Sequence, residues 1–167
     1  MNDDRKSPDL FQRFLDIMRA LSAEKVDYVL IGGFAVILHG LPRLTADIDI
    51  FIQPKSGNLE RLKKALRRVF PQDEEIDSLS LRDFQDYAVV RFGTADEFYI
   101  DFIAGIGEMF RYEDLKYEIR DIEGVQIRTA TPETLLRMKE NTVRPEDKRD
   151  ALFLEDLIAK RNSKKKQ

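Results

Sequence analysis

The chain contains no cysteine, so it can form neither a disulfide bond nor a metal site built on thiolates. It has one histidine, His39, which excludes zinc sites that need two or three histidines. The G-x-x-x-x-G-K-[ST] loop of P-loop proteins and the G-x-G-x-x-G loop of dinucleotide-binding proteins are both absent. The N-terminal residues lack the apolar core of a signal peptide, and no apolar run is long enough to span a membrane. We therefore expect a cytoplasmic protein without membrane contact.

The overall composition is that of an ordinary globular domain. Of 167 residues, 35% are charged and 43% are apolar, which argues against a disordered chain. The net charge of −3 excludes a uniformly basic nucleic-acid-binding surface, although a local basic patch remains compatible with it. We expect a single domain over residues 1–160. The remaining residues, 161–167, contain no apolar side chain, and we expect them to form a disordered basic tail.

The most informative stretch of the sequence runs from Tyr28 to Ile52. It opens with an apolar run typical of a strand, breaks at Gly32 and Gly33, and continues in a short apolar pattern typical of a helix. A glycine pair between a strand and a helix exposes backbone N–H groups at the start of the helix. Such groups bind phosphate well, so this turn is a candidate phosphate site.

Acidic residues follow on the next predicted strand. In residues 47–52 the alternation places Asp47 and Asp49 on one face and isoleucines on the other. Two neighbouring carboxylates repel each other unless a cation neutralises them, and a site made of oxygen ligands favours Mg²⁺. Asp101 interrupts a second apolar run, where it is either a third carboxylate of the same site or a solvent-facing side chain on a half-exposed strand. A phosphate site beside a metal site is what a nucleotide-using enzyme requires.

Capping residues and periodicity predict the remaining elements. Proline after a hydroxyl or polar residue indicates helix starts at Ser7-Pro8, Thr131-Pro132 and Arg144-Pro145, and a short helix is expected within 108–115. Two β-hairpins are expected, one with strands 88–92 and 97–103 around the loop 93–96, and one with strands 117–122 and 125–129. The last helix is expected to bury a stripe made of Ala151, Leu152, Leu154, Leu157 and Ile158.

Two motifs resemble a known family. The pattern GG-x-A-x-x-x-HG-x-x-R-x-T-x-D-x-D, at residues 32–49, resembles the signature of the DNA polymerase β-like nucleotidyltransferase superfamily, and more closely its small bacterial AbiEii-like branch. The C-terminal motif of that branch is matched by Lys139, Arg144, Asp147 and Asp150. The glycine-serine pair usual in the superfamily is Gly32-Gly33 here, so a serine hydroxyl that would touch phosphate is missing. The two motifs bracket nearly the whole chain.

The resemblance implies an α+β, nucleotidyltransferase-type fold with a mixed central sheet, helices packed around it, and the metal and nucleotide site at the sheet edge. It implies a two-metal enzyme that transfers NMP from an NTP to an acceptor hydroxyl of RNA or protein, in a toxin–antitoxin or phage-defence setting. A cognate antitoxin is a further implied partner. The implied cofactor is Mg²⁺, as two ions, with Mn²⁺ as a substitute. The implied catalytic and metal-binding residues are Asp47, Asp49 and Asp101, and the implied nucleotide-binding residues are Gly32, Gly33, Arg43, Thr45 and Lys139.

Two other functions fit the same residues. A small antibiotic nucleotidyltransferase of the lincosamide or aminoglycoside kind shares the GG…D-x-D core and would use a small-molecule acceptor. A nucleotide-binding or antitoxin-bound module without turnover is the third hypothesis, and the presence of all three acids argues against it. Single residues also have simpler interpretations: Arg43 as a surface ion pair, Thr45 as a loop hydrogen bond, and His39 as a structural histidine, which we favour over a catalytic base.

Overall fold

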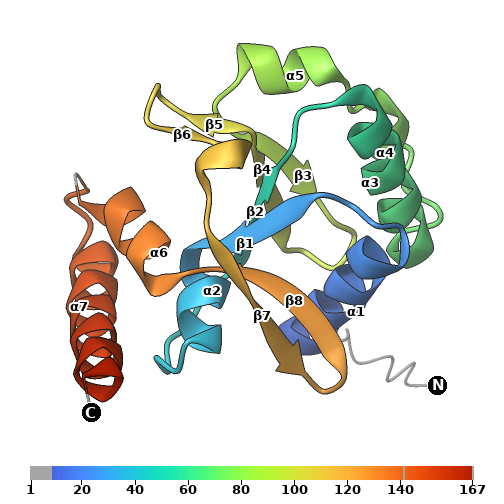
Figure 1. The fold of residues 1–167 in the computed structure, drawn as a ribbon. Coiled ribbons are helices and arrows are strands. Elements are labelled where there is room, and N and C mark those ends of the chain that lie inside the picture. Colours follow the sequence, from blue (N-terminus) through green and yellow to red (C-terminus); the bar gives the residue numbers. More distant parts are fainter. Residues whose placement is uncertain (1–8, 141, 167) are drawn as a thin grey trace.

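A six-stranded mixed sheet forms the centre of the protein, in a computed structural model that describes residues 9–140 and 142–166 (Figure 1). The strand order is β3-β4-β2-β1-β8-β7. Strand β2 pairs antiparallel with β1 and parallel with β4, and β1 pairs parallel with β8. The strands are β1 (Tyr28–Ile31), β2 (Asp47–Ile52), β3 (Val90–Gly93), β4 (Tyr99–Ile103), β7 (Tyr117–Ile122) and β8 (Val125–Ala130). The arrangement confirms the predicted α+β fold with a mixed sheet.

Helices surround this sheet. Helices α1 (Leu10–Ala23) and α3 (Ser56–Val69) pack together on the right of Figure 1, whereas α6 (Pro132–Lys139) and α7 (Pro145–Lys165) pack together on the left. Helix α2 (Gly32–Leu38) follows β1 directly and contacts β2 and α6, and its Phe34 stacks on Phe14 of α1 at 4.3 Å between ring centroids. Smaller elements complete the fold: α4 (Glu75–Ser78), α5 (Leu81–Asp86), β5 (Gly105–Ile106), β6 (Phe110–Arg111) and the 3₁₀ turn η1 (Tyr112–Asp114).

Strand β2 has the predicted bounds and the predicted alternation. Ile48, Ile50 and Ile52 are buried in the core, whereas Asp47 and Asp49 are only partly buried on the opposite face. The apolar face of the strand stabilises the fold through burial, at roughly 25 cal/mol for each Å² removed from water. One strand therefore anchors the core with one face and presents two carboxylates with the other.

Some predicted elements differ from the structure for local reasons. The N-cap of α1 is Asp9, whose carboxylate accepts a hydrogen bond from the N–H of Phe11, and the predicted cap Ser7 lies outside the described residues. Residues 108–115 were expected to be helical, but β6 and η1 form there. Gly107 adopts a left-handed turn at φ 55°, and Phe110 is buried after it, so the chain folds back as a short β-ribbon with β5.

The C-terminal helix also differs from the prediction. Residues 161–165 were expected to be disordered, but they continue α7, and Arg161 anchors this end through two hydrogen bonds to Glu118 of β7, at 3.1 and 3.2 Å. Leu152 was expected in the buried stripe, yet its side chain is 68% exposed, because Asp150 and Leu154 take the inward positions. Among the described residues, no helix combines the length and the apolar character needed to cross a membrane.

Candidate active site

The three aspartates predicted from the sequence lie on neighbouring strands. Strands β2 and β4 pair in parallel with Asp49 opposite Asp101, and Asp47 lies two residues before Asp49 on the same face. Asp101 is only 7% exposed, so it is not the solvent-facing residue of the alternative interpretation. We expected the site at the sheet edge, but these strands are internal, one position in from the edge strand β3. Paired strands therefore hold the acids in one row on a rigid support.

The row of aspartates is electrostatically unfavourable for Asp49. The pKa of Asp49 is raised to about 6, chiefly by burial and then by the neighbouring charges of Asp101 and Asp47. The positive charges of Lys139 and Arg91 act in the opposite direction, but they do not outweigh these effects. Part of the negative charge at this site is therefore left without compensation.

The glycine pair lies directly beside the acidic row. Gly32 has φ +69°, and a Cβ added there would lie 2.0 Å from Oδ2 of Asp49, so no larger residue fits without moving the carboxylate. A Cβ added to Gly33 would lie 2.8 Å from Oγ1 of Thr45 and 3.4 Å from Cζ of Arg43. The structure thus brings the start of α2, the following loop and the acidic strand into contact. Helix α2 begins at the glycines themselves.

Lys139 and Arg43 meet at a buried aspartate of the C-terminal motif. Lys139 Nζ lies 3.0 Å from Asp147 and 2.9 Å from Asp150, and Arg43 also forms an ion pair with Asp150. Asp150 is 1% exposed, and its Oδ1 has no hydrogen-bond partner among the described residues. Arg43 is therefore held by a buried carboxylate and not by a surface ion pair. The nearby Thr45 hydroxyl donates to the carbonyl of Asp47 at 3.3 Å, so it does form the loop hydrogen bond of the simpler interpretation.

Arg91 is a neighbour of the acidic row that our sequence analysis did not assign. Its Nε donates to Oδ1 of Asp101 at 2.8 Å and its Nη2 donates to Oδ2 at 2.9 Å, while Nη2 also lies 3.6 Å from Asp47. It belongs to the lining of an open cavity of about 530 Å³ at the face of the sheet. The residues lining this cavity are Ile31, Asp47, Asp49, Val89, Arg91, Asp101, Ile103 and Arg144. Arg144 matched the C-terminal motif, but we had given it no role.

The donor set fits a hard divalent cation in its chemistry. It consists of carboxylate oxygens on one rigid face, and the ionised form of Asp49, whose pKa is raised, would be stabilised by a cation. Within residues 9–140 and 142–166, however, no three acidic or histidine side chains stand close enough together to hold an ion. Both oxygens of Asp101 accept hydrogen bonds from the guanidinium of Arg91 instead.

His39 lies at the other end of α2 and has structural contacts. Its Nε2 donates to the carbonyl oxygen of Ala130 at 2.8 Å, and its Nδ1 accepts from Arg120 at 2.9 Å. Burial lowers the pKa of His39, which favours the neutral ring that these two contacts require. Both ring nitrogens are thus engaged, which favours the structural interpretation.

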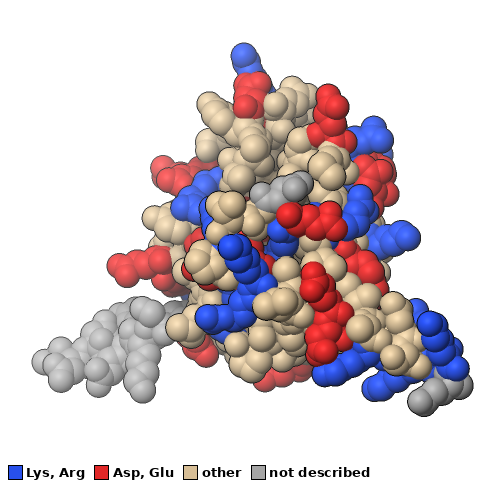
Figure 2. Space-filling view, turned by 90° about the vertical axis from the view of Figure 1, so that its left-hand side faces the viewer, with Lys and Arg blue, Asp and Glu red and all other residues tan. Residues whose placement is uncertain are grey.

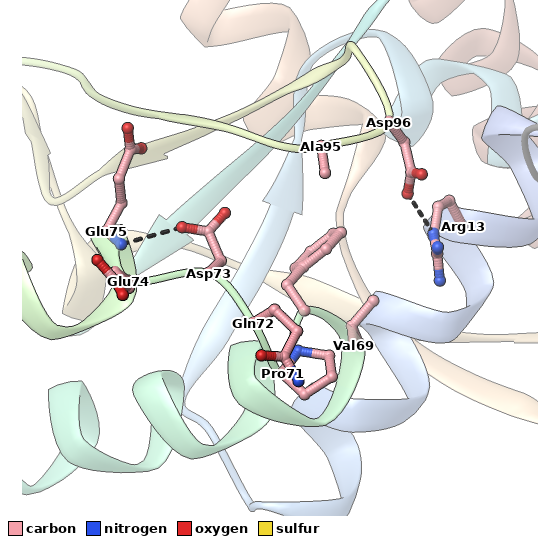
Figure 3. Close-up of a pocket in the computed structure, with 10 residues that line it drawn as sticks. Arg13, Val69, Pro71, Gln72, Asp73, Glu74, Glu75, Ala95 and Asp96 are labelled. Carbon is pink, nitrogen blue, oxygen red and sulfur yellow. Dashed lines mark hydrogen bonds and ion pairs between the residues drawn. The ribbon is translucent and has the colours of Figure 1, made fainter.

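Other surface features lie apart from these residues. A cavity of about 510 Å³ opens beside the end of α3, where Arg13 forms an ion pair with Asp96 across it, and none of the predicted site residues lines it (Figure 3). Basic residues of α3 pair with acids of their own surroundings: Arg61 with Asp27, Arg67 with Asp77 and Arg68 with Glu24. On the face that carries α7, cationic and acidic side chains are interspersed (Figure 2). The 530 Å³ cavity at the acidic row is therefore the candidate active site.

Comparison with known proteins agrees with this architecture. The lincomycin-bound lincosamide antibiotic adenylyltransferase LnuA is 16% identical and has a TM-score of 0.56, with 87% of this chain and 96% of that chain covered. The antibiotic-resistance factor ANT(2″)-Ia is 17% identical with a TM-score of 0.54, covering 93% and 94%, and JHP933 from Helicobacter pylori is 19% identical with a TM-score of 0.50, covering 90% and 66%. At these identities the likeness shows the fold alone.

The sequence also matches a family model. No curated protein matches the chain at a significant level. The model described as "Nucleotidyl transferase AbiEii toxin, Type IV TA system" matches residues 13–147, which include the glycine pair, the three acids and Lys139. Because this match spans well over half of the sequence, the chain belongs to the AbiEii nucleotidyltransferase toxin family of type IV toxin–antitoxin systems.

Proposed function

We propose that this protein transfers NMP from an NTP to an acceptor hydroxyl in a reaction that depends on divalent metal ions. The observation that carries the proposal is the pairing of Asp49 with Asp101 across two parallel strands, with Gly32 packed against Asp49. An acid row in contact with the start of a helix offers metal ligands and phosphate donors side by side.

Asp47, Asp49 and Asp101 would hold Mg²⁺, as a pair of ions, with Mn²⁺ as a substitute. When bound, the ions would activate the attacking hydroxyl and neutralise charge on the triphosphate. The acceptor oxygen forms a bond to the α-phosphorus, the bond from that phosphorus to the bridging oxygen breaks, and pyrophosphate leaves. Asp101 would take the proton of the acceptor hydroxyl, for which it must first be released from Arg91.

The triphosphate would bind beside the acids. Backbone N–H groups of Gly32 and Gly33 would face its β- and γ-phosphates, and their lack of side chains lets phosphate approach the backbone. Lys139 would contribute a cation, and its ammonium is held by ion pairs with Asp147 and Asp150. Arg43 and Thr45 pack on Gly33 and would fix the loop that faces the nucleotide.

Calorimetry tests the nucleotide site. Binding of each of the four NTPs is measured with Mg²⁺ and with EDTA. For any NTP that binds, we expect the affinity to be at least about tenfold lower in EDTA, because metal ions screen the phosphates from the carboxylates. A variant with Asp47→Asn and Asp49→Asn should lose this difference, whereas Asp156→Asn, at an exposed position of α7, should keep it. Equal affinities with Mg²⁺ and EDTA in the unmodified protein would refute the proposal.

For the acceptor we propose RNA, with protein as the second choice. Two arginines, Arg91 and Arg144, line the cavity, and basic side chains gather at the C-terminal end of α7, including Lys164 and Lys165 (Figure 2). Cationic groups of this kind bind phosphodiesters and make affinity depend steeply on salt. A cognate antitoxin remains part of the proposal because of the toxin–antitoxin family.

Transfer assays identify the acceptor. Each α-³²P-labelled NTP is incubated with total RNA, with bacterial protein extract, and with a lincosamide and an aminoglycoside, and the labelled product is separated from NTP. Labelled RNA is the expected result. Label on an antibiotic would favour the small-molecule alternative, and NTP binding without any transfer would favour a non-catalytic module.

Deletion of residues 163–167 gives a second test of the RNA acceptor. It should leave magnesium-dependent NTP binding unchanged but weaken RNA binding and reduce its dependence on salt, because fewer phosphates are neutralised. RNA affinity is measured for both proteins over a series of salt concentrations. If RNA affinity depends on salt equally in both proteins, the end of α7 does not bind the RNA acceptor.

A further inference from the structure

Asp101 is a buried carboxylate whose charge is balanced by a half-exposed arginine. The side chain of Asp101 is 10% exposed, so water solvates its charge poorly and it needs a cationic partner. The side chain of its partner Arg91 is 53% exposed, on the edge strand β3. The pair is held in place by strand register, because Arg91 lies opposite Asp101 in the antiparallel ladder of β3 and β4.

Arg91 also has a second contact that does not involve the acids. Its Cζ lies 4.6 Å from the ring centroid of Tyr99, which is the residue of β4 opposite Asp47. Stacking on an aromatic ring stabilises a guanidinium without using its N–H donors. The side chain therefore has a position on Tyr99 that it can keep after its hydrogen bonds to Asp101 are broken.

A divalent cation and Arg91 would compete for the same oxygens. Both oxygens of Asp101 accept from the guanidinium, and Nη2 of Arg91 also lies 3.6 Å from Asp47, so Arg91 bridges two of the three acids. A cation bound by these acids would lie next to the guanidinium, and like charges at such short range repel each other strongly in a partly buried site. Asp101 therefore cannot bind Arg91 and a divalent cation at the same time without a large unfavourable electrostatic energy.

We infer that Arg91 is a built-in counter-cation of the acidic row: it neutralises Asp101 and Asp47 in the metal-free protein, and when a divalent cation binds it releases Asp101 and keeps its contact with Tyr99. Arg91 thereby stabilises the metal-free fold and lowers the affinity for metal, since metal binding must break the ion pair. This inference rests on the proposed function in so far as the acids bind a divalent cation.

Two measurements on the complete chain test the inference, with Mn²⁺ alone as the probe. Mn²⁺ affinity is measured by titration with electron paramagnetic resonance detection, and the melting temperature is measured in EDTA. For Arg91→Gln we expect Mn²⁺ binding to tighten roughly threefold to tenfold and the melting temperature in EDTA to fall. Arg91→Lys keeps the charge but loses the paired hydrogen bonds, so its affinity should lie between those of the other two proteins.

Arg144→Gln is the matched control. Arg144 lines the same cavity, but within the part of the chain that the structure describes it forms no ion pair with the three acids. Its loss reports the general effect of removing one positive charge, which should be smaller than the effect at Arg91. If Arg144→Gln tightens Mn²⁺ binding as much as Arg91→Gln, the specific role of Arg91 is refuted.

The remaining outcomes separate the inference from the proposed function. If the unmodified protein binds Mn²⁺ and both Arg91 variants bind it equally well, the inference is wrong and the metal site stands. If the unmodified protein binds no Mn²⁺, the metal site of the proposed function is refuted, and the inference with it. If Arg91→Gln does not fold, Arg91→Lys alone decides, and an affinity equal to that of the unmodified protein overturns the inference.

Discussion

Replacing Asp49 with asparagine should make the metal-free protein more stable and abolish transfer. The pKa of Asp49 is raised from 3.8 to about 6, chiefly by burial and then by Asp101 and Asp47. A difference of about 2 pKa units corresponds to a free-energy cost of about 3 kcal/mol for ionising this carboxyl in the folded protein. Because Asp49 is partly exposed, we treat this figure as an upper limit and expect a gain of about 1–3 kcal/mol in the free energy of unfolding.

The pH dependence of the free energy of unfolding shows the direction in which Asp49 acts on stability. Between about pH 4 and pH 6 the folded protein retains a proton on Asp49 that the unfolded chain has already released, so the folded state binds more protons. The contribution of this group to stability is therefore present below pH 4, falls as pH rises through 6, and stays low above it. Asp49→Asn removes that loss, so the variant should exceed the unmodified protein at pH 7.5 and approach it at pH 4.5.

Urea unfolding in EDTA at these two pH values measures the effect, with Asp156→Asn as the exposed control. Addition of Mg²⁺ should stabilise the unmodified protein more than the variant, because only the former keeps all three carboxylates. A variant that is less stable than the unmodified protein at pH 7.5 in EDTA would show that Asp49 has a structural role. Retained transfer by the variant would exclude Asp49 as a metal ligand.

Three further substitutions test single contacts. Gly32→Ala should lower the free energy of unfolding by at least about 1–2 kcal/mol, because residue 32 has a left-handed backbone, and it should weaken NTP binding by displacing Asp49. Gly57→Ala on α3 is the control, because that position has room for a methyl group, and it should have neither effect. Urea unfolding measures the stability of both variants, and calorimetry measures their NTP binding. Asp150→Ala should lower the free energy of unfolding by about 3 kcal/mol, because it leaves Lys139 and Arg43 without their buried partner; an effect below about 1 kcal/mol would contradict this. His39→Ala should lower the free energy of unfolding by about 1–3 kcal/mol, while transfer persists in the labelled-NTP assay. Loss of transfer at unchanged stability would instead indicate that His39 is a catalytic base.

Much of the fold was predictable where sequence and structure are locally linked. The alternation of residues 47–52 fixed both bounds of β2, and Thr131 caps α6 as predicted, accepting from the N–H of Thr134. Predictions failed where contacts between residues far apart in the sequence determine the local structure. Residues 161–165 have no apolar side chain, yet α7 continues there because Arg161 reaches Glu118 on β7, and sequence spacing does not reveal that contact.

The role of Arg91 was missed because of one hairpin loop. We expected the loop at residues 93–96, which would place Phe92 next to residue 97 in the ladder and move Arg91 away from Asp101. In the structure Gly93 pairs with Tyr99, and Thr94 closes the loop by donating from its N–H and hydroxyl to the carbonyl of Phe98. That shift of register brings Arg91 opposite Asp101, so a longer loop determines which cation meets the acidic row.

The charges of the candidate site are paired unevenly, and this distribution indicates where an external cation would gain most. Asp101 has Arg91, and Asp150 has Lys139 and Arg43. Within residues 9–140 and 142–166 Asp49 has no ion pair, and burial and its acidic neighbours raise its pKa. A cation that binds at Asp49 removes an existing cost without breaking an ion pair, whereas binding at Asp101 must displace Arg91. We therefore expect metal to engage Asp49 first, so that Arg91→Gln should tighten the binding of this first Mn²⁺ ion. It should tighten the binding of a second ion, which must use Asp101, by a larger factor.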